Sequence, residues 1–136
     1  MKLTPARRSA IAQDLIADMA AGTANPNPLI EIYAGTIPTT MGGTITDTLI
    51  AALTPTATVG TETGGVITFD AITEDAAADA TATAGWARIL DRDRAEAMYL
   101  TVSVIGAGGD IQLGSVDISV GLPVSFSSGI ITVGGI

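Results

Sequence analysis

The sequence predicts a mainly β protein: an antiparallel β-sandwich or barrel-like domain with one N-terminal α-helix. Short runs of alternating apolar residues recur along the chain, separated by Gly, Pro and polar turns about every eight to twelve residues. Hydrophobic residues make up 47% of the 136 residues but aromatic residues only 4%, which favours thin, closely packed sheets of Ile, Val, Leu and Ala. A chain of this length fits one domain.

The stretch predicted as a helix begins at Thr4, which can cap free N–H groups and is followed by a proline suited to a first helical turn. Ile11, Leu15 and Met19 recur at every fourth position and form one apolar stripe. Gly22 is a suitable stop. The helix either docks on its own domain, which we favour, or forms an arm that packs against a neighbouring subunit.

The sequence Asn-Pro-Asn-Pro at residues 25–28 predicts an extended, fairly stiff linker, because residues before proline avoid the helical region. We therefore divide the chain into an N-terminal helix and linker arm, residues 1–28, and a single β domain, residues 29–136. In the first strand of that domain, residues 29–34, Ile30 and Ile32 share one face.

Alternation and turn residues place the remaining strands and turns. Strands are expected at residues 47–54, 66–69, 81–90, 98–105, 111–113, 116–122, 124–126 and 130–133. The first of these, residues 47–54, alternates like a strand, but its residue types also suit a helix. Residues 35–43 and 106–110 should be loops, residues 55–65 a connection with one short strand, residues 91–94 a solvated hairpin tip, and residues 127–129 a turn. The Ala-rich face of the 81–90 strand should let another backbone approach closely, with Trp86 filling the deeper end as a core residue rather than a ligand platform.

Charge and composition exclude several classes of function. The formal net charge of −8, from 6 basic and 14 acidic residues, argues against binding to nucleic acid or an anionic membrane. Without Cys or His, the commonest general base and the usual zinc ligands are missing. No apolar run is long enough to span a bilayer and no signal-peptide core appears. We therefore expect a non-enzyme without a cofactor, made and kept in the cytoplasm.

The closely spaced acids are the main candidates for site chemistry. Asp70, Glu74, Asp75 and Asp79 could offer oxygen ligands to calcium, but their spacing does not fit an EF-hand loop. A carboxylate pair for sugar hydrolysis is the weaker possibility, since no aromatic platform or cleft is predicted beside it. We expect solvated loop acids. A second acidic group, Asp91, Asp93 and Glu96, is interrupted by arginines that would compete with a cation.

The order of several segments resembles a poorly characterised family of small virion-associated proteins of tailed bacteriophages and prophages. The resemblance covers the N-terminal helix and the segments IEIYAGTIPTT (30–40), LIAALT (49–54), GGVITFDAITEDAAADATATAGWARILDRD (64–93) and GGDIQLGSVDISVGLPVSFSSGIITV (108–133). Residues 92–96, Arg-Asp-Arg-Ala-Glu, depart from the tighter turn expected there. The resemblance implies a virion component and no catalytic residues.

From this resemblance we expect a structural virion protein, first a capsid decoration or cement protein that stabilises the head lattice. The alternative is a tail, neck or fibre component that binds a tail partner or a host-surface glycan. A mean hydropathy of +0.48 suggests that other subunits cover part of the surface. The expected partners are the major capsid protein or other virion proteins, and further copies of the chain in an oligomer such as a trimer. The candidate subunit contacts are Ile11, Leu15, Met19, Ile30 and Ile32.

Overall fold

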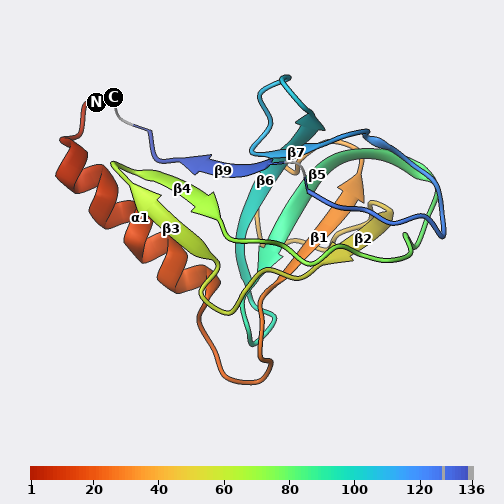
Figure 1. The fold of residues 1–136 in the computed structure, drawn as a ribbon, viewed down its shortest axis with the longest axis horizontal. Coiled ribbons are helices and arrows are strands. Elements are labelled where there is room, and N and C mark those ends of the chain that lie inside the picture. The colour runs from red at the N-terminus through yellow and green to blue at the C-terminus, as the bar shows by residue number, and fades with distance from the viewer. Residues whose placement is uncertain (127, 135–136) are drawn as a thin grey trace.

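The computed structural model describes residues 1–126 and 128–134, and this part of the chain forms one helix and nine strands. The prediction of a mainly β fold with one N-terminal helix is confirmed (Figure 1). The elements are α1 (Pro5–Met19), β1 (Leu29–Ala34), β2 (Leu49–Leu53), β3 (Gly60–Thr63), β4 (Val66–Phe69), β5 (Ala82–Leu90), β6 (Glu96–Val104), β7 (Ile111–Leu113), β8 (Asp117–Ile118) and β9 (Ser128–Thr132).

The strands belong to one curled sheet rather than to two stacked sheets. Its order is β2-β1-β5-β6-β7-β9-β4-β3, and β8 pairs with the beginning of β5 off this path. All neighbours are antiparallel except β6 and β7, which pair in parallel. Of the two predicted forms, a sandwich and a barrel-like domain, the barrel-like one is therefore closer to the structure. The expectation of a wholly antiparallel sheet is corrected, because β7 pairs in parallel with β6.

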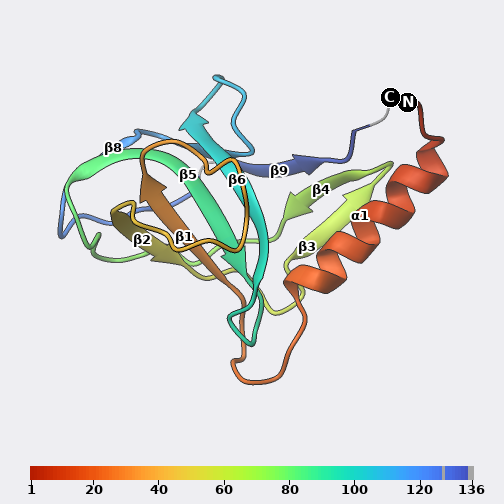
Figure 2. The same cartoon turned by 180° about the vertical axis from the view of Figure 1, so that it is seen from behind.

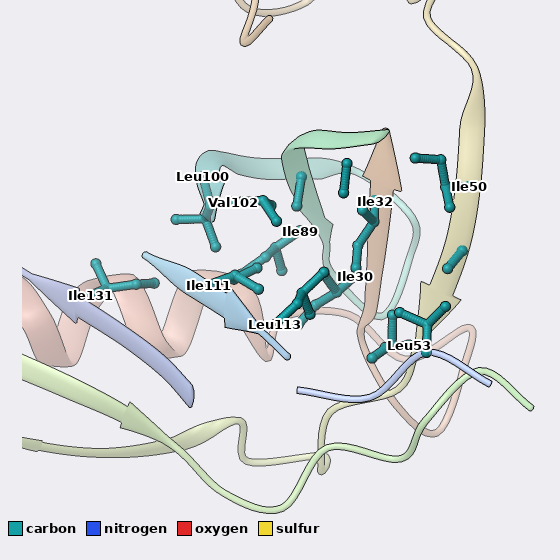
Figure 3. Packing of buried hydrophobic residues seen from close by; sticks show 14 of the residues in the cluster. Ile30, Ile32, Ile50, Leu53, Ile89, Leu100, Val102, Ile111, Leu113 and Ile131 are labelled. Carbon is teal, nitrogen blue, oxygen red and sulfur yellow. The ribbon is translucent and has the colours of Figure 1, made fainter. Parts of the chain in front are cut away.

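One face of the curled sheet forms the core, and it consists of aliphatic side chains as the composition predicts (Figure 3). In β1 and β5, alternation places Ile30, Ile32 and Ile89 on this face, all without solvent exposure. Side chains from the other strands complete the cluster, among them Ile50, Leu53, Ile67, Leu100, Val102, Ile111, Leu113 and Ile131.

Helix α1 lies along β3 and β4 and contributes to the same core (Figure 1). The Thr4 hydroxyl accepts a hydrogen bond from the Arg7 N–H, which confirms the predicted cap. Ala12 and Met19 have no solvent exposure. On the neighbouring strand, Glu62 accepts hydrogen bonds from the Ser9 hydroxyl and from the Gln13 amide. The helix is thus docked on its own domain, which was the favoured prediction.

The tip of the β5–β6 hairpin holds the segment that follows α1. The Asp93 carboxylate accepts hydrogen bonds from the N–H groups of Thr23 and Ala24, at 2.9 and 2.8 Å. The Arg92 guanidinium donates to the Asn25 carbonyl. The Arg94 guanidinium donates to the carbonyl of residue 27. Residues 93–95 of the tip are exposed, as predicted, but the charged side chains of the tip also tie the linker to the sheet.

Close backbone approach at β5 agrees with the prediction of a thin strand face. Gly85 lies against Gly35, where an added Cβ would stand 1.7 Å from the Gly35 carbonyl oxygen. The Ala84 N–H donates to the Val116 carbonyl on the other side of the strand. At position 85, only glycine leaves room for the Gly35 backbone.

The C-terminal third differs most from the prediction. Of the strand expected at residues 116–122, only Asp117–Ile118 forms, and Val120 and Leu122 are 59% and 58% exposed. The Val120 N–H donates to the Thr81 hydroxyl, and the chain then turns through Gly121 at a φ of +83°.

The structure of the segments after this turn also differs in part from the prediction. The strand expected at residues 124–126 is reduced to one bridge between Asp75 and Val124. Of the turn expected at residues 127–129, residue 127 lies outside the described residues, and the other two belong to β9.

Candidate functional site

A charge-free surface lies on the side of β3, β4 and β9 that faces away from α1. Gly64 and Gly65 form the two-residue turn between β3 and β4. Both have a positive φ, +59° and +90°, as tight two-residue hairpin turns require. The register aligns Thr63, Val66 and Thr132 in one row across the strands. It aligns Thr61, Thr68 and Ile130 in the next row. We call these six residues the open face.

The open face is exposed and contains only β-branched, uncharged side chains. All six residues are exposed, and Val66 and Ile130 remain 37% and 43% accessible. β-branched side chains have few rotamers to lose on binding, and an uncharged surface needs no charge to be removed from water. In a chain with 14 acidic residues, such a surface has the composition of the centre of a protein interface, where charged residues are depleted.

The acid nearest to this surface along the chain is directed to the other side of the sheet. Glu62 pairs with Ile67 in the β3–β4 register and therefore shares the face that α1 covers. The Ser9 hydroxyl, and after it the Gln13 amide, hold the pKa of Glu62 below its ordinary value. Helix α1 thus keeps this carboxylate ionised and away from the open face.

An aromatic and ionic cluster lies on the side of β1, β5 and β6 that faces away from the aliphatic core. It contains both tyrosines and the only tryptophan of the chain. The rings of Tyr33 and Trp86 stack with centroids 4.7 Å apart, and Tyr99 lies against Trp86 at 5.0 Å. Trp86 is fully buried, as predicted, but on the side of the sheet opposite to the aliphatic core.

Arg88 joins two carboxylates within this cluster. Its guanidinium lies 2.7 Å from Glu31 and 2.9 Å from Glu96. Burial disfavours the charged guanidinium, but the hydrogen bonds to Glu96 and Glu31 outweigh this effect and raise the pKa of Arg88. The Tyr99 hydroxyl, and after it Arg88, lower the pKa of Glu96. Both carboxylates are therefore held by partners, and Glu96 in particular is a poor general acid.

The loop between β1 and β2, residues 35–48, covers this cluster. Figure 2 shows the loop crossing in front of β5 and β6. The Asp47 carboxylate accepts a hydrogen bond of 2.8 Å from the Trp86 indole, and the Ala34 N–H donates to the carbonyl of residue 48. Trp86 consequently supports the loop, and Trp86 and Tyr33 are too deeply buried to stack on a ligand.

The predicted subunit contacts are separated by the structure. Ile11 is 39% exposed and Leu15 is partly buried against the core. Met19, Ile30 and Ile32 have no exposed surface within the single chain. Within the single chain, the apolar periodicity that marked these three residues reflects burial in their own core.

The acidic residues that the sequence singled out do not come together at one site. Asp75 accepts hydrogen bonds from the N–H groups of Ala52 and Ala77 and covers the outer edge of β2. Asp70 accepts from the Thr56 hydroxyl. Asp91 accepts from the N–H groups that follow it in the hairpin turn. Within residues 1–126 and 128–134, no group of three acidic side chains lies close enough together to hold a metal ion.

Comparisons with protein-family models, with curated proteins and with solved structures gave no match. In the described part of the chain, α1 is neither long nor apolar enough to cross a membrane. The chemistry of the surface is therefore the basis on which a function can be proposed.

Sequence reasoning identified most strands of the open face but not the face itself. The Gly64-Gly65 pair and the 66–69 strand pointed to the hairpin. The pairing of β4 with β9 joins residues more than sixty positions apart, and no local pattern announces it. The available signal was the alternation of threonine with other residues in β3 and β4.

Proposed function

We propose that this chain is a structural virion protein of a tailed bacteriophage, most directly a capsid decoration or cement protein that stabilises the head lattice. The observation that carries the proposal is the open face: six exposed, uncharged residues on three paired strands. Such a surface suits extended contact with a protein lattice, because each copy can bury it without desolvating a charge.

The distribution of cations also supports contact with protein rather than with packaged DNA. Arg88 is bound to Glu31 and Glu96, while Arg92 and Arg94 donate to carbonyls of the linker. Phosphate binding requires several accessible cations on one surface. The resemblance of the central segment, residues 64–93, to virion-associated proteins of tailed phages then favours other virion proteins as the partners. The work of such a protein is mechanical: many modest contacts together resist the pressure of packaged DNA.

Binding to purified phage heads that lack the protein tests the role of the open face. Thr68→Lys and Ile130→Lys place a charge near its centre, and each should weaken binding by about tenfold or more, because the ammonium group must lose water on contact. Thr44→Lys adds the same charge to an exposed position in the 35–48 loop and should bind like the wild type. Equal binding by all three variants would show that the shell contact lies elsewhere.

A further inference from the structure

A depression of about 230 Å³ lies between β7 and the C-terminal loop, at the end of the molecule away from the start of α1. In Figure 2, β8 and the N-terminal end of α1 lie on opposite sides of the molecule along its long axis. The lining mixes polar and apolar residues in similar numbers. The polar ones are Ser115, Asp117, Ser119 and Ser125, and the apolar ones include the exposed Leu122.

Exposed carboxylates and exposed aliphatic side chains lie in and next to the segments that line the depression. Backbone hydrogen bonds from Ala78 to Leu122 and from Gly121 to Ala78 place the segment that carries the exposed Asp79 against the 121–122 turn. Asp117 is exposed and accepts from the Thr83 hydroxyl. Val120 and Leu122 project with more than half of their surfaces accessible. We call Asp79, Asp117, Val120 and Leu122 the acidic end.

The opposite end of the molecule carries the complementary chemistry. Lys2 and Arg7 are exposed at the start of α1, next to the exposed Pro5 and Ala6. Arg8 is turned inward, where it donates to the Leu3 carbonyl and lies against the Gly64-Gly65 turn. We call Lys2, Pro5, Ala6 and Arg7 the basic end.

The other cations of the described chain have partners within their own copy. Arg88 is bound by two carboxylates, and Arg92 and Arg94 hold the linker. Arg94 is also exposed but is held by the linker, so Lys2 and Arg7, both at the basic end, are the exposed cations that remain for an outside contact.

We propose that the basic end of one copy docks on the acidic end of a second copy. The Lys2 and Arg7 cations face the Asp79 and Asp117 carboxylates, while Pro5 and Ala6 cover the exposed Val120 and Leu122. The two surfaces lie at opposite ends of the molecule, so one copy cannot satisfy its own acidic end. Because the surfaces differ, each pair leaves one of each free, and the assembly continues into a chain or closes into a ring.

This contact does not depend on the proposed virion function, since it requires only copies of this chain. It also leaves the open face unoccupied, so that a failure of shell binding and a failure of self-association are separate results. A self-contact through the open face would instead be two-fold symmetric and would stop at the dimer.

Sedimentation velocity of the full chain, at about 50 mM and about 500 mM salt and up to about 0.5 mM protein, tests the proposal. The wild type should form a concentration-dependent series beyond the dimer at low salt. Lys2→Glu/Arg7→Glu and Asp79→Lys/Asp117→Lys should each associate at least about tenfold more weakly. Asp14→Lys/Asp18→Lys, on the exposed side of α1, makes the same charge change as the second variant and should keep the series.

The decisive experiment mixes the two charge-reversed variants. Each reversed end then meets an end of opposite charge on the other variant, so the equimolar mixture should regain association that neither variant shows alone. Circular dichroism of each variant establishes that it is folded. A wild type that stays monomeric at low salt, a series that stops at the dimer, or a mixture of folded variants that stays dissociated would overturn the proposal.

Discussion

Asp93 lies directly against Gly22: a Cβ added to this glycine would stand 2.5 Å from the Asp93 carboxyl carbon. The same carboxylate accepts the N–H groups of the two residues that follow. Gly22 also adopts a φ of +99°, a conformation that residues with a side chain rarely accept. The exit from α1 and the β5–β6 hairpin tip are thus fitted to one another.

Replacing Gly22 with alanine should lower the free energy of unfolding by about 2–3 kcal/mol, because backbone strain and the collision with Asp93 add together. Gly42→Ala is the matched control. Gly42 has a φ of +84° but no atom within 4 Å of the added Cβ, so only backbone strain of about 1 kcal/mol is expected. Urea denaturation of both variants measures the difference. Equal losses would mean that the contact with Asp93 is not tight.

The Asp93 carboxylate should make stability depend on acid pH. Hydrogen bonds from the N–H groups of Ala24 and Thr23 lower the pKa of Asp93 in the folded chain. A depressed folded pKa adds stability that is present above the unfolded value of about 3.9 and is lost as the pH falls through the folded value. Asp93→Asn removes the charge, so the stability difference between wild type and variant should shrink below about pH 4.

Chemical denaturation at a series of pH values, with Asp14→Asn as a control on the exposed side of α1, measures this dependence. The control should run parallel to the wild type. If the difference between wild type and Asp93→Asn stays constant from neutral pH to acid, the carboxylate charge does not hold the linker.

Met19 and Ile11 share the apolar stripe of α1 but should respond differently to truncation. Met19 has no exposed surface, whereas Ile11 is 39% exposed. Met19→Ala should cost about 2–4 kcal/mol of unfolding free energy, and Ile11→Ala about 1 kcal/mol or less. Thermal and urea unfolding provide the comparison. Similar losses at both positions would restore the case for Met19 as an outward contact.

The hydrogen bond between Asp47 and Trp86 should hold the 35–48 loop over the sheet. Asp47→Ala should increase amide hydrogen exchange in that loop while β1 and β5 stay protected, with a loss of about 1–2 kcal/mol. Because Trp86 is the only tryptophan, its fluorescence reports on the same site and should shift to the red. Thr46→Ala, at an exposed position, is the control. Unchanged exchange would assign the loop's position to its other contacts.

The parts of the fold that were predictable are those with a local cause. Thr4 and the following proline mark the start of α1, and Gly64-Gly65 bounds β4. Alternation correctly put Ile30 and Ile32 on one face of β1. The same alternation failed at residues 116–122, where backbone groups find partners in residues 78–81 instead of a sheet neighbour.

The candidate site was less predictable because it is made by pairing between distant segments. A periodic apolar stripe shows that side chains are buried, but not whether they are buried in their own chain or in a partner. For that reason Met19, Ile30 and Ile32 were assigned as contacts and proved to be core. The open face carries mostly threonine, which hydropathy does not mark, and it becomes one surface only when β9 joins β4.

The copy number of this chain in purified virions, measured by quantitative mass spectrometry against the major capsid protein, tests the central proposal most directly. A decoration protein should be present in a fixed ratio close to that of the shell subunits. A ratio far below that would contradict decoration and fit the tail, neck or fibre alternative, and absence from the virion would contradict a structural role altogether.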